Sequence, residues 1–447
     1  MLRRTLATMV FLATGTSYLV AQTPVEQLST TSPTEILCAP AAEAKPALPP
    51  YAGPLCERST ITGDWLGHRS SLRDCGFTVD AYATQFYQGV VDGGVRNGFN
   101  YGGRFDLLLN IDGEKAGLNK GLFISLHDET LYGVSVNNFT GALSPVSAGQ
   151  FFPVPNGPVN ALTNVKVTQF LSETFCVFGG KLNMVDDFKQ PFAGYRGVDG
   201  FMNMNFSFPL IFGRTVPYST YAAGFAVLKN LEPVLTFMVL DTNSSPTTSG
   251  FNTFFDNGAS VLGNVNLPTQ FFGKKGHQGI LATYSNRSYT ELQDLPYLIL
   301  SNLTGRVPNP APQSGSWAIN YSFDQTVGSF CNDPTRSWGL FGNAGISDGN
   351  PNPIRWSASA GLGGSVPFAS RPLDRFGVAY YYLGVSETLK NFGPRNRILG
   401  DEQGVETYYT VGFTPWCKVT ADLQVINPTR SRVDTSLSVG LRARLDF

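Results

Sequence analysis

The sequence predicts an all-β protein, namely a transmembrane antiparallel β-barrel of about 16 strands with a short N-terminal helix and long extracellular loops. Three observations predict this fold. Apolar and polar residues alternate in many short segments, the connections between these segments are alternately long and short, and the composition is poor in charge but rich in glycine and aromatic residues. The alternation and the composition also occur in soluble β-proteins, whereas the unequal connections favour the membrane barrel.

The segment 436–447 shows the alternation most clearly. Because successive side chains of a strand point to opposite faces, this segment has one apolar face and one polar face. It is long enough to span a bilayer as a tilted strand. The apolar face carries Leu437, Val439, Leu441, Ala443, Leu445 and Phe447, and the other carries Ser436, Ser438, Gly440, Arg442, Arg444 and Asp446.

The bulk composition restricts the possible functions. Charged residues make up 15% of the 447 residues, compared with about 25% in typical soluble domains. The chain also contains 48 glycines and 13% aromatic residues. The net charge of −1 gives no basic surface of the kind that binds nucleic acid.

The first 21 residues are typical of a secretory signal peptide. Arg3 and Arg4 precede a largely apolar run that ends near Ala21, and a cleavage site there would leave Gln22 as the first residue. A membrane anchor is the alternative, but the run is shorter than the ~20 residues of a spanning helix. Residues 22–60, rich in Pro, Ala and Thr, are predicted to form a flexible leader, and residues 61–447 the barrel domain.

The cysteines and histidines indicate no metal or cofactor site. The three histidines are scattered, and none of the six cysteines forms a CxxC motif. Cys38 and Cys56 are the closest in sequence among those that could pair in an oxidising compartment, but the sequence leaves the connectivity open.

A short helix is predicted to begin at Asp64, run to about Asp74 and end at Gly76. Beyond Phe77 the pattern is that of strands. The predicted strands are 77–90, 101–113, 121–129, 163–170, 173–183, 218–229, 233–241, 265–272, 277–285, 315–325, 337–346, 355–366, 375–385, 402–413, 415–426 and 436–447.

The connections between these strands differ strongly in length on the two sides. Outer-membrane barrels have short periplasmic turns and longer extracellular loops, whereas a sandwich has no reason to place most loop residues on one side. The long set is 91–100, 130–162, 184–217, 242–264, 286–314, 347–354, 386–401 and 427–435. The short set is 114–120, 171–172, 230–232, 273–276, 326–336, 367–374 and residue 414.

Several motifs then resemble one family in order along the chain. They are ITGDWLGHR from Ile61 with Gly76-Phe77, RFDLLLNID from Arg104, GKLNMVDDF from Gly180, DRFG from Asp374 with YYYLGVS from Tyr380, and a C-terminal block that includes PW at Pro415, DLQVINP from Asp422 and Val439–Phe447. Through these motifs the chain resembles the carbohydrate-selective porins of the OprB family, from about Ile61 to Phe447. The six cysteines and the long leader depart from the family pattern.

The resemblance implies passive diffusion of small carbohydrates across the bacterial outer membrane into the periplasm, through a water-filled barrel. The partners it implies are the permeating sugars, outer-membrane lipid and the outer-membrane assembly machinery, which would recognise Phe447. Oligomeric state and the preferred sugar stay open. No catalytic residue, cofactor or metal is implied.

Candidate residues on the sugar path follow from the alternation and from the long segment 184–217, which is rich in Phe and expected to fold into the lumen. The candidates are Arg104, Asp106, Lys181, Asn183, Asp186, Asp187, Arg196, Arg442 and Arg444. Charged side chains on an inner face are costly in a dry core but expected beside water. For Arg104 and Asp106, the alternative is an ion pair that shapes the wall without contacting sugar. For Asp186 and Asp187, it is pairing with basic neighbours at the rim that only holds the loop, and for Arg442 and Arg444 it is solvation in the lumen.

Two other functions are left open by the sequence. One is a structural or adhesive barrel with a closed lumen. The other is a secreted β-rich glycoside hydrolase, which needs two carboxylates across a sugar. The pairs Asp128-Glu129, Asp186-Asp187 and Asp401-Glu402 are adjacent in sequence, and adjacent strand residues point to opposite faces.

Overall fold

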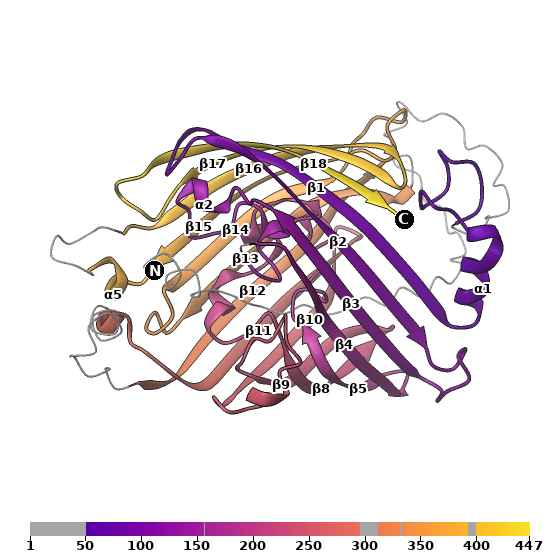
Figure 1. Ribbon diagram of the computed structural model, residues 1–447, viewed down its shortest axis with the longest axis horizontal. Coiled ribbons are helices and arrows are strands. Elements are labelled where there is room, and N and C mark those ends of the chain that lie inside the picture. The colour runs from indigo at the N-terminus through magenta and orange to yellow at the C-terminus, as the bar shows by residue number, and fades with distance from the viewer. Residues whose placement is uncertain (1–50, 156, 296–311, 331–332, 392–398) are drawn as a thin grey trace.

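The chain forms a closed antiparallel barrel of 16 strands, each paired with its neighbour in sequence, and β1 pairs with β18 (Figure 1). The computed structural model describes residues 51–447 apart from 156, 296–311, 331–332 and 392–398. The strands are β1 (Phe77–Gly94), β2 (Gly98–Asp112), β3 (Leu122–Gly133), β4 (Val159–Ser172), β5 (Phe175–Asn183), β8 (Ser219–Lys229), β9 (Glu232–Asp241), β10 (Ala259–Phe271), β11 (Lys274–Tyr289), β12 (Gln313–Phe330), β13 (Asp333–Ser347), β14 (Ile354–Ser365), β15 (Arg375–Val385), β16 (Glu402–Thr414), β17 (Cys417–Asn427) and β18 (Asp434–Asp446).

All sixteen predicted strands are confirmed, although several extend beyond their predicted ends. The strands predicted at 265–272 and 277–285 are β10 and β11, and β11 runs on to Tyr289. The predicted long loop 91–100 is instead a turn of three residues, 95–97, because β1 and β2 extend into it. Beyond Val90, β1 stays paired with β18 through two register shifts.

The barrel closes through a register that differs from the prediction. Tyr82 lies opposite Asp446, and the amide of Phe447 donates to the carbonyl oxygen of Ala81 at 2.8 Å. Phe447 was expected to pair near Phe77, but Phe77 pairs with Ile111 of β2. The first strand therefore begins closer to the α1 end of the barrel than the position where the last strand ends.

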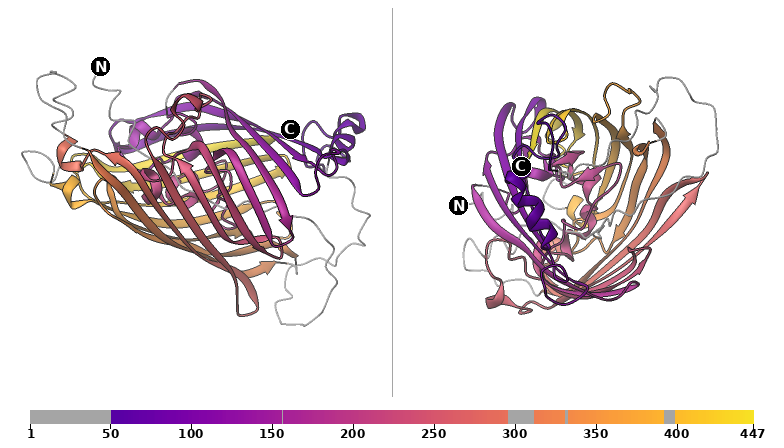
Figure 2. Two further views of the ribbon diagram at one scale, coloured as in Figure 1. Left: turned by 90° about the horizontal axis from the view of Figure 1, so that it is seen from below. Right: turned by 90° about the vertical axis from the view of Figure 1, so that its right-hand side faces the viewer.

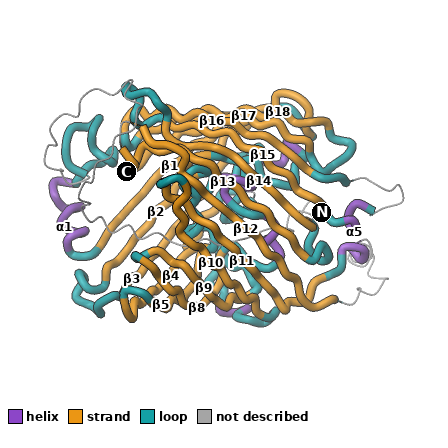
Figure 3. The backbone as a smooth tube through the Cα atoms, turned by 180° about the vertical axis from the view of Figure 1, so that it is seen from behind, coloured by secondary structure: helices purple, strands orange, loops and turns teal. Residues whose placement is uncertain are grey.

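The two ends of the barrel differ. Helix α1 (His68–Asp74) and the C-terminal end of β18 lie at one end, and α5 (Glu387–Lys390) lies at the other (Figure 3). The tight β4–β5, β8–β9 and β10–β11 turns lie at the α1 end, which is therefore the periplasmic end. Among the described residues, no helix has the length and apolar character needed to span a bilayer.

The periplasmic segment packs against the barrel. The Asp64 carboxylate accepts from the amide and hydroxyl of Ser70 at 2.8 Å, after the 3₁₀ turn η1 (Trp65–Gly67). Gly76 ends the helix with φ 93°, and a Cβ there would lie 2.6 Å from the carbonyl oxygen of Asp112. Residues 51–60, predicted to belong to the flexible leader, contact the barrel. The carbonyl oxygen of Leu55 accepts from the indole of Trp416 at 2.7 Å, and Tyr51 and Thr60 are buried, although residues 53–57 are exposed.

The predicted signal peptide and the leader up to residue 50 lie outside the described residues, as do Cys38 and Cys331. Of the described cysteines, Cys56, Cys75, Cys176 and Cys417 are free thiols.

Two connections fold into the barrel, and the view along the barrel shows them within the ring of strands (Figure 2). The inner loop, residues 184–218, joins β5 to β8, and the second loop joins β3 to β4. The inner loop carries β6 (Gly194–Tyr195), β7 (Asp199–Gly200), α3 (Met204–Ser207) and η3 (Leu210–Arg214), and the second loop carries α2 (Asn137–Thr140) and η2 (Ala148–Gln150). Two further 3₁₀ turns, η4 (Phe251–Thr253) and η5 (Leu292–Asp294), lie in other long connections.

Candidate functional site at the constriction of the barrel

The inner loop closes much of the lumen with apolar side chains, as its Phe-rich sequence predicts. The ring of Phe201 lies 4.8 Å from Tyr408 of β16 and 5.5 Å from Phe341 of β13. Phe206 lies 5.7 Å from Tyr381 of β15. These inward aromatic residues form one core with the loop, so this side of the lumen is packed rather than wet.

Buried side chains of the wall hold both loops by their backbones. Glu406 of β16 accepts from the amides of Met202 and Asn203 at 2.5 and 2.8 Å. Glu402, on the same face of β16, accepts from two amides of the second loop at 2.5 and 2.9 Å. Arg442 of β18 donates to two carbonyl oxygens of the inner loop at 2.8 and 2.9 Å. These contacts satisfy backbone groups that would otherwise be buried without partners.

A buried ionic cluster fixes the opposite side of the inner loop. Arg104 of β2 forms a two-pronged pair with Asp106 at 2.8 and 2.5 Å and also contacts Glu129 of β3. It donates to the carbonyl oxygen of Gly149 in the second loop at 3.0 Å. Both Arg104 and Asp106 are almost fully buried. Their charges therefore depend on each other rather than on water.

Arg196 brings the inner loop into this cluster. Its guanidinium contacts Glu129, and it lies 2.5 Å from Asp186 and 2.9 Å from the hydroxyl of Tyr218. Burial opposes the charge of Arg196, but the carboxylates and Tyr218 outweigh it and hold the pKa of Arg196 well above its ordinary value. His127 of β3 completes the cluster between Asp186 at 2.7 Å and Asp106 at 3.0 Å.

Part of this cluster has the residue types of a metal site. Ligand atoms of Asp106, His127 and Glu129 all lie within 4.8 Å of one another. However, Arg104 and Arg196 already place their guanidinium groups on these carboxylates. The donor set therefore fits guanidinium partners rather than a metal ion.

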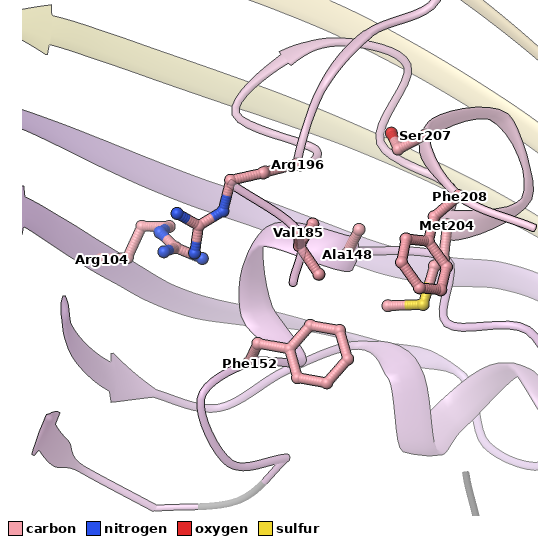
Figure 4. Close-up of a pocket in the computed structure, with 8 residues that line it drawn as sticks. All are labelled: Arg104, Ala148, Phe152, Val185, Arg196, Met204, Ser207 and Phe208. Atoms are coloured by element: carbon pink, nitrogen blue, oxygen red, sulfur yellow. The ribbon is translucent and has the colours of Figure 1, made fainter. Parts of the chain in front are cut away.

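A small cavity lies between the two loops beside the cluster. Figure 4 shows the side chains of Arg104 and Arg196 together on one side of it and apolar side chains such as Phe152, Met204 and Phe208 on the other. Its volume of about 10 Å³ is room for about one water molecule. No sugar path runs through a space of this size.

A larger groove, of about 60 Å³, lies between the inner loop and the wall formed by β10, β11 and β12. Half of the residues on its wall side carry an amide or a hydroxyl, and the others are His277, Asp324 and two apolar residues. The wall contributes Asn264, Asn266, His277, Leu281, Asn320, Ser322, Phe323 and Asp324, and the inner loop contributes residues 187–190, Pro209 and Phe212. On the loop side, Phe188 is half-buried and Lys189 is exposed.

The candidate residues from the sequence do not share one place. Arg104, Asp106, Asn183, Asp186 and Arg196 meet in the buried cluster, where the Asn183 amide donates to Glu129 at 3.1 Å. The cluster therefore corresponds to the ion-pair alternative and leaves these side chains little exposure to the lumen.

The remaining candidates lie elsewhere. Lys181 was expected on the inward face, but it pairs with Tyr221 and donates to the carbonyl oxygens of Leu162 and of Thr248 in the β9–β10 connection at 2.9 and 2.8 Å. Lys181 therefore lies away from the cluster, although Asn183, two residues later, belongs to it. The two side chains part because β5 ends at Asn183 and the strict alternation of faces ends with it.

Asp187 pairs with Lys166 of β4 and also lines the groove. Arg442 was expected to face water but is buried against the inner loop. Arg444 is half-buried, pairs with Asp446 at 2.7 Å and lies over the ring of Tyr82.

Sequence reasoning missed the groove wall. Asn320, Ser322 and Asp324 alternate with larger apolar residues in a strand that was predicted, so the alternation could have found them. It also missed His127 and Glu129, whose partners lie on other strands and in the inner loop.

Comparison with known proteins assigns the family. The model described as "Carbohydrate-selective porin, OprB family" matches residues 96–447. The chain belongs to this family. The porin is thus an outer-membrane channel for small carbohydrates, and its family and fold indicate a channel rather than an enzyme.

Solved structures share the fold of the porin. The high-pH structure of Pseudomonas putida OprB has a TM-score of 0.75 at 21% identity, covering 88% of this chain and 99% of that chain. The low-pH structure of the same protein has a TM-score of 0.55 at 16% identity, covering 88% and 99%. Among curated proteins, no match was found.

Proposed function

We propose that carbohydrates cross the porin through the groove between the inner loop and the β10–β12 wall. The groove carries the proposal, since it is the larger of the two cavities described above and its lining includes four amide side chains and a hydroxyl beside charged and apolar residues. On the other sides of the inner loop, aromatic packing and the ionic cluster leave little room.

The groove suits neutral, hydroxyl-rich solutes. A sugar that enters must replace its hydrogen bonds to water, and Asn264, Asn266 and Ser322 offer both donors and acceptors. Each such bond contributes only about 0.5–1.5 kcal/mol net, so the solute is guided but released, as conduction requires. The half-buried ring of Phe188 provides an apolar surface for the face of a sugar ring.

Export and insertion complete the proposal. Residues 1–21 direct secretion and are removed, and residues 61–447 insert as the barrel. Phe447 is the residue by which the assembly machinery recognises the chain. Its aromatic ring, which lies 6.2 Å from Phe105 at the periplasmic rim of the seam, supports this role.

The path is tested by Asn264→Leu, with Asn119→Leu in the exposed β2–β3 turn as the control. Proteoliposome swelling with a neutral monosaccharide should slow about 2- to 10-fold in the first variant, the equivalent of one lost hydrogen bond. The conductance of KCl should fall less than the sugar rate. Equal loss of sugar and ion permeability would mean that Asn264 only narrows the pore, and unchanged sugar permeation would exclude the groove as the path.

The closed-lumen alternative is tested by the same preparation. An absence of both swelling and single-channel conductance for the unmodified porin would show that the inner loop seals the barrel.

A further inference from the structure

Two neighbouring periplasmic turns place a large apolar side chain in a backbone conformation that disfavours it. Phe272, in the β10–β11 turn, has φ 52° and is fully exposed at 102%. Leu231, in the β8–β9 turn, has φ 65° and is 47% exposed. Turns of this kind favour Gly, Asn or Asp at such positions. Because the Phe272 side chain is fully exposed, contacts within the described chain do not offset its unfavourable backbone.

These two turns continue the apolar outer face of the barrel. Leu235 of β9 and Val265 of β10 lie opposite each other and are 38% and 40% exposed. Towards the turn, Leu267 and Phe271 of β10 are 51% and 50% exposed. On this face of β10, Thr269 is the one polar residue between Leu267 and Phe271, so the lipid-facing surface continues, with this single interruption, to the tip of the β10–β11 hairpin.

Each turn has lysine on one side, and the β8–β9 turn has Glu232 on the other side, opposite Lys229. Lys229 precedes the β8–β9 turn, and Lys274 and Lys275 follow Phe272; all three are exposed. An apolar tip with flanking lysines is the arrangement that anchors proteins at a membrane surface, because the lysine ammonium reaches the phosphates while the apolar group enters the acyl boundary.

We propose that the β8–β9 and β10–β11 turns form an interfacial anchor in the inner leaflet of the outer membrane. Leu231 and Phe272 insert at the boundary between headgroups and acyl chains, and the three lysines bind phospholipid phosphates. The anchor depends on insertion of the barrel and is independent of the sugar path. A protein partner in the periplasm is the competing occupant, and the experiment separates the two.

The test uses Phe272→Trp in proteoliposomes of phosphatidylethanolamine and phosphatidylglycerol, with and without brominated acyl chains. The porin has five native tryptophans, and their contribution is corrected for by subtracting the emission of the unmodified porin. Ser71→Trp, on the exposed part of α1, is the matched control. The added emission at position 272 should fall by about half or more with brominated lipid and should resist quenching by iodide. The emission of the Ser71→Trp control should be quenched by iodide and should not change with brominated lipid. Iodide quenching without bromide quenching at position 272 would overturn the proposal.

A second variant tests the energetics. Phe272→Asn relieves the unfavourable backbone, so without lipid contact it should raise the urea midpoint of unfolding in liposomes. An interfacial anchor predicts a lower midpoint instead. Gly117→Asn is the control for placing Asn in a turn at positive φ, because Gly117 has φ 76° in the β2–β3 turn and open space around it. A raised midpoint for Phe272→Asn would contradict the anchor. The decrease in the midpoint should grow with the phosphatidylglycerol content, and Lys274→Gln with Lys275→Gln should weaken that dependence, since Lys229 remains.

Discussion

The inner loop should depend on Arg196, and this dependence can be measured. Arg196→Met removes the guanidinium that contacts Glu129, Asp186 and Tyr218, while the side chain that replaces it still fills most of the space. The Arg196 side chain is only 2% exposed, and Asp186 loses its guanidinium partner at 2.5 Å while it keeps His127 at 2.7 Å. Removing one partner of a buried ion pair costs about 3–5 kcal/mol, because the other charge is left buried.

The assay is urea unfolding of the porin in liposomes, together with single-channel recording. The free energy of unfolding of Arg196→Met should fall by about 3–5 kcal/mol. Its conductance should rise or fluctuate, since the inner loop keeps Glu406 and Arg442 as anchors but loses its contact with Glu129 of β3 and keeps only that of Asp186 with His127 there. The control is Lys115→Met, because Lys115 is 57% exposed and lies 3.8 Å from Asp112. An exposed pair of this kind contributes about 0–1 kcal/mol.

The reasoning would be refuted if Arg196→Met lost no more stability than Lys115→Met. That result would mean that water or a rearranged Arg104 already satisfies the carboxylates. If Arg196→Met lost the expected stability but kept its conductance, the effect on stability would be confirmed and the effect on the loop would not. The inner loop would then be held mainly by contacts with β16 and β18.

Three further outcomes are expected. Arg69→Gln should lower the free energy of unfolding by about 2 kcal/mol with unchanged conductance, because the Arg69 guanidinium donates to Val79 and Phe447 at 2.7 and 2.9 Å, far from the inner loop; an altered conductance would contradict this. Asp128→Leu should stabilise the barrel in lipid by about 1 kcal/mol. Asp128 pairs with Leu107 on the outer face and accepts from Asn160 at 2.7 Å. Destabilisation would indicate that protein, rather than lipid, covers this face. Deletion of Phe447 should reduce the amount of folded barrel in the outer membrane far more than it changes the conductance of the barrels that form.

The strands could be predicted because their signal is local. Each strand has a lipid-facing side whose alternation is visible within about ten residues, and all sixteen were identified on this basis. Their ends were less predictable. β11 continues to Tyr289 and β10 begins at Ala259, where the alternation of apolar and polar residues in the sequence weakens.

The site could be predicted only in outline. The inward folding of the inner loop followed from its many Phe residues, but its partners come from strands far apart in sequence. Glu129 and Arg196 are 67 residues apart in sequence, and no local sequence pattern predicts their contact. Alternation also assigned Lys181 and Asn183 to one face, which fails where the sheet ends.

Arg69 has a consequence for the order of folding. It contacts Phe447 across 378 residues of sequence, so this contact closes a very long loop of the chain. Contacts of such long range close at a high entropic cost and are made late. Interactions absent from the folding transition state act mainly by slowing unfolding. The periplasmic segment should therefore set how long the closed barrel survives rather than how fast it forms.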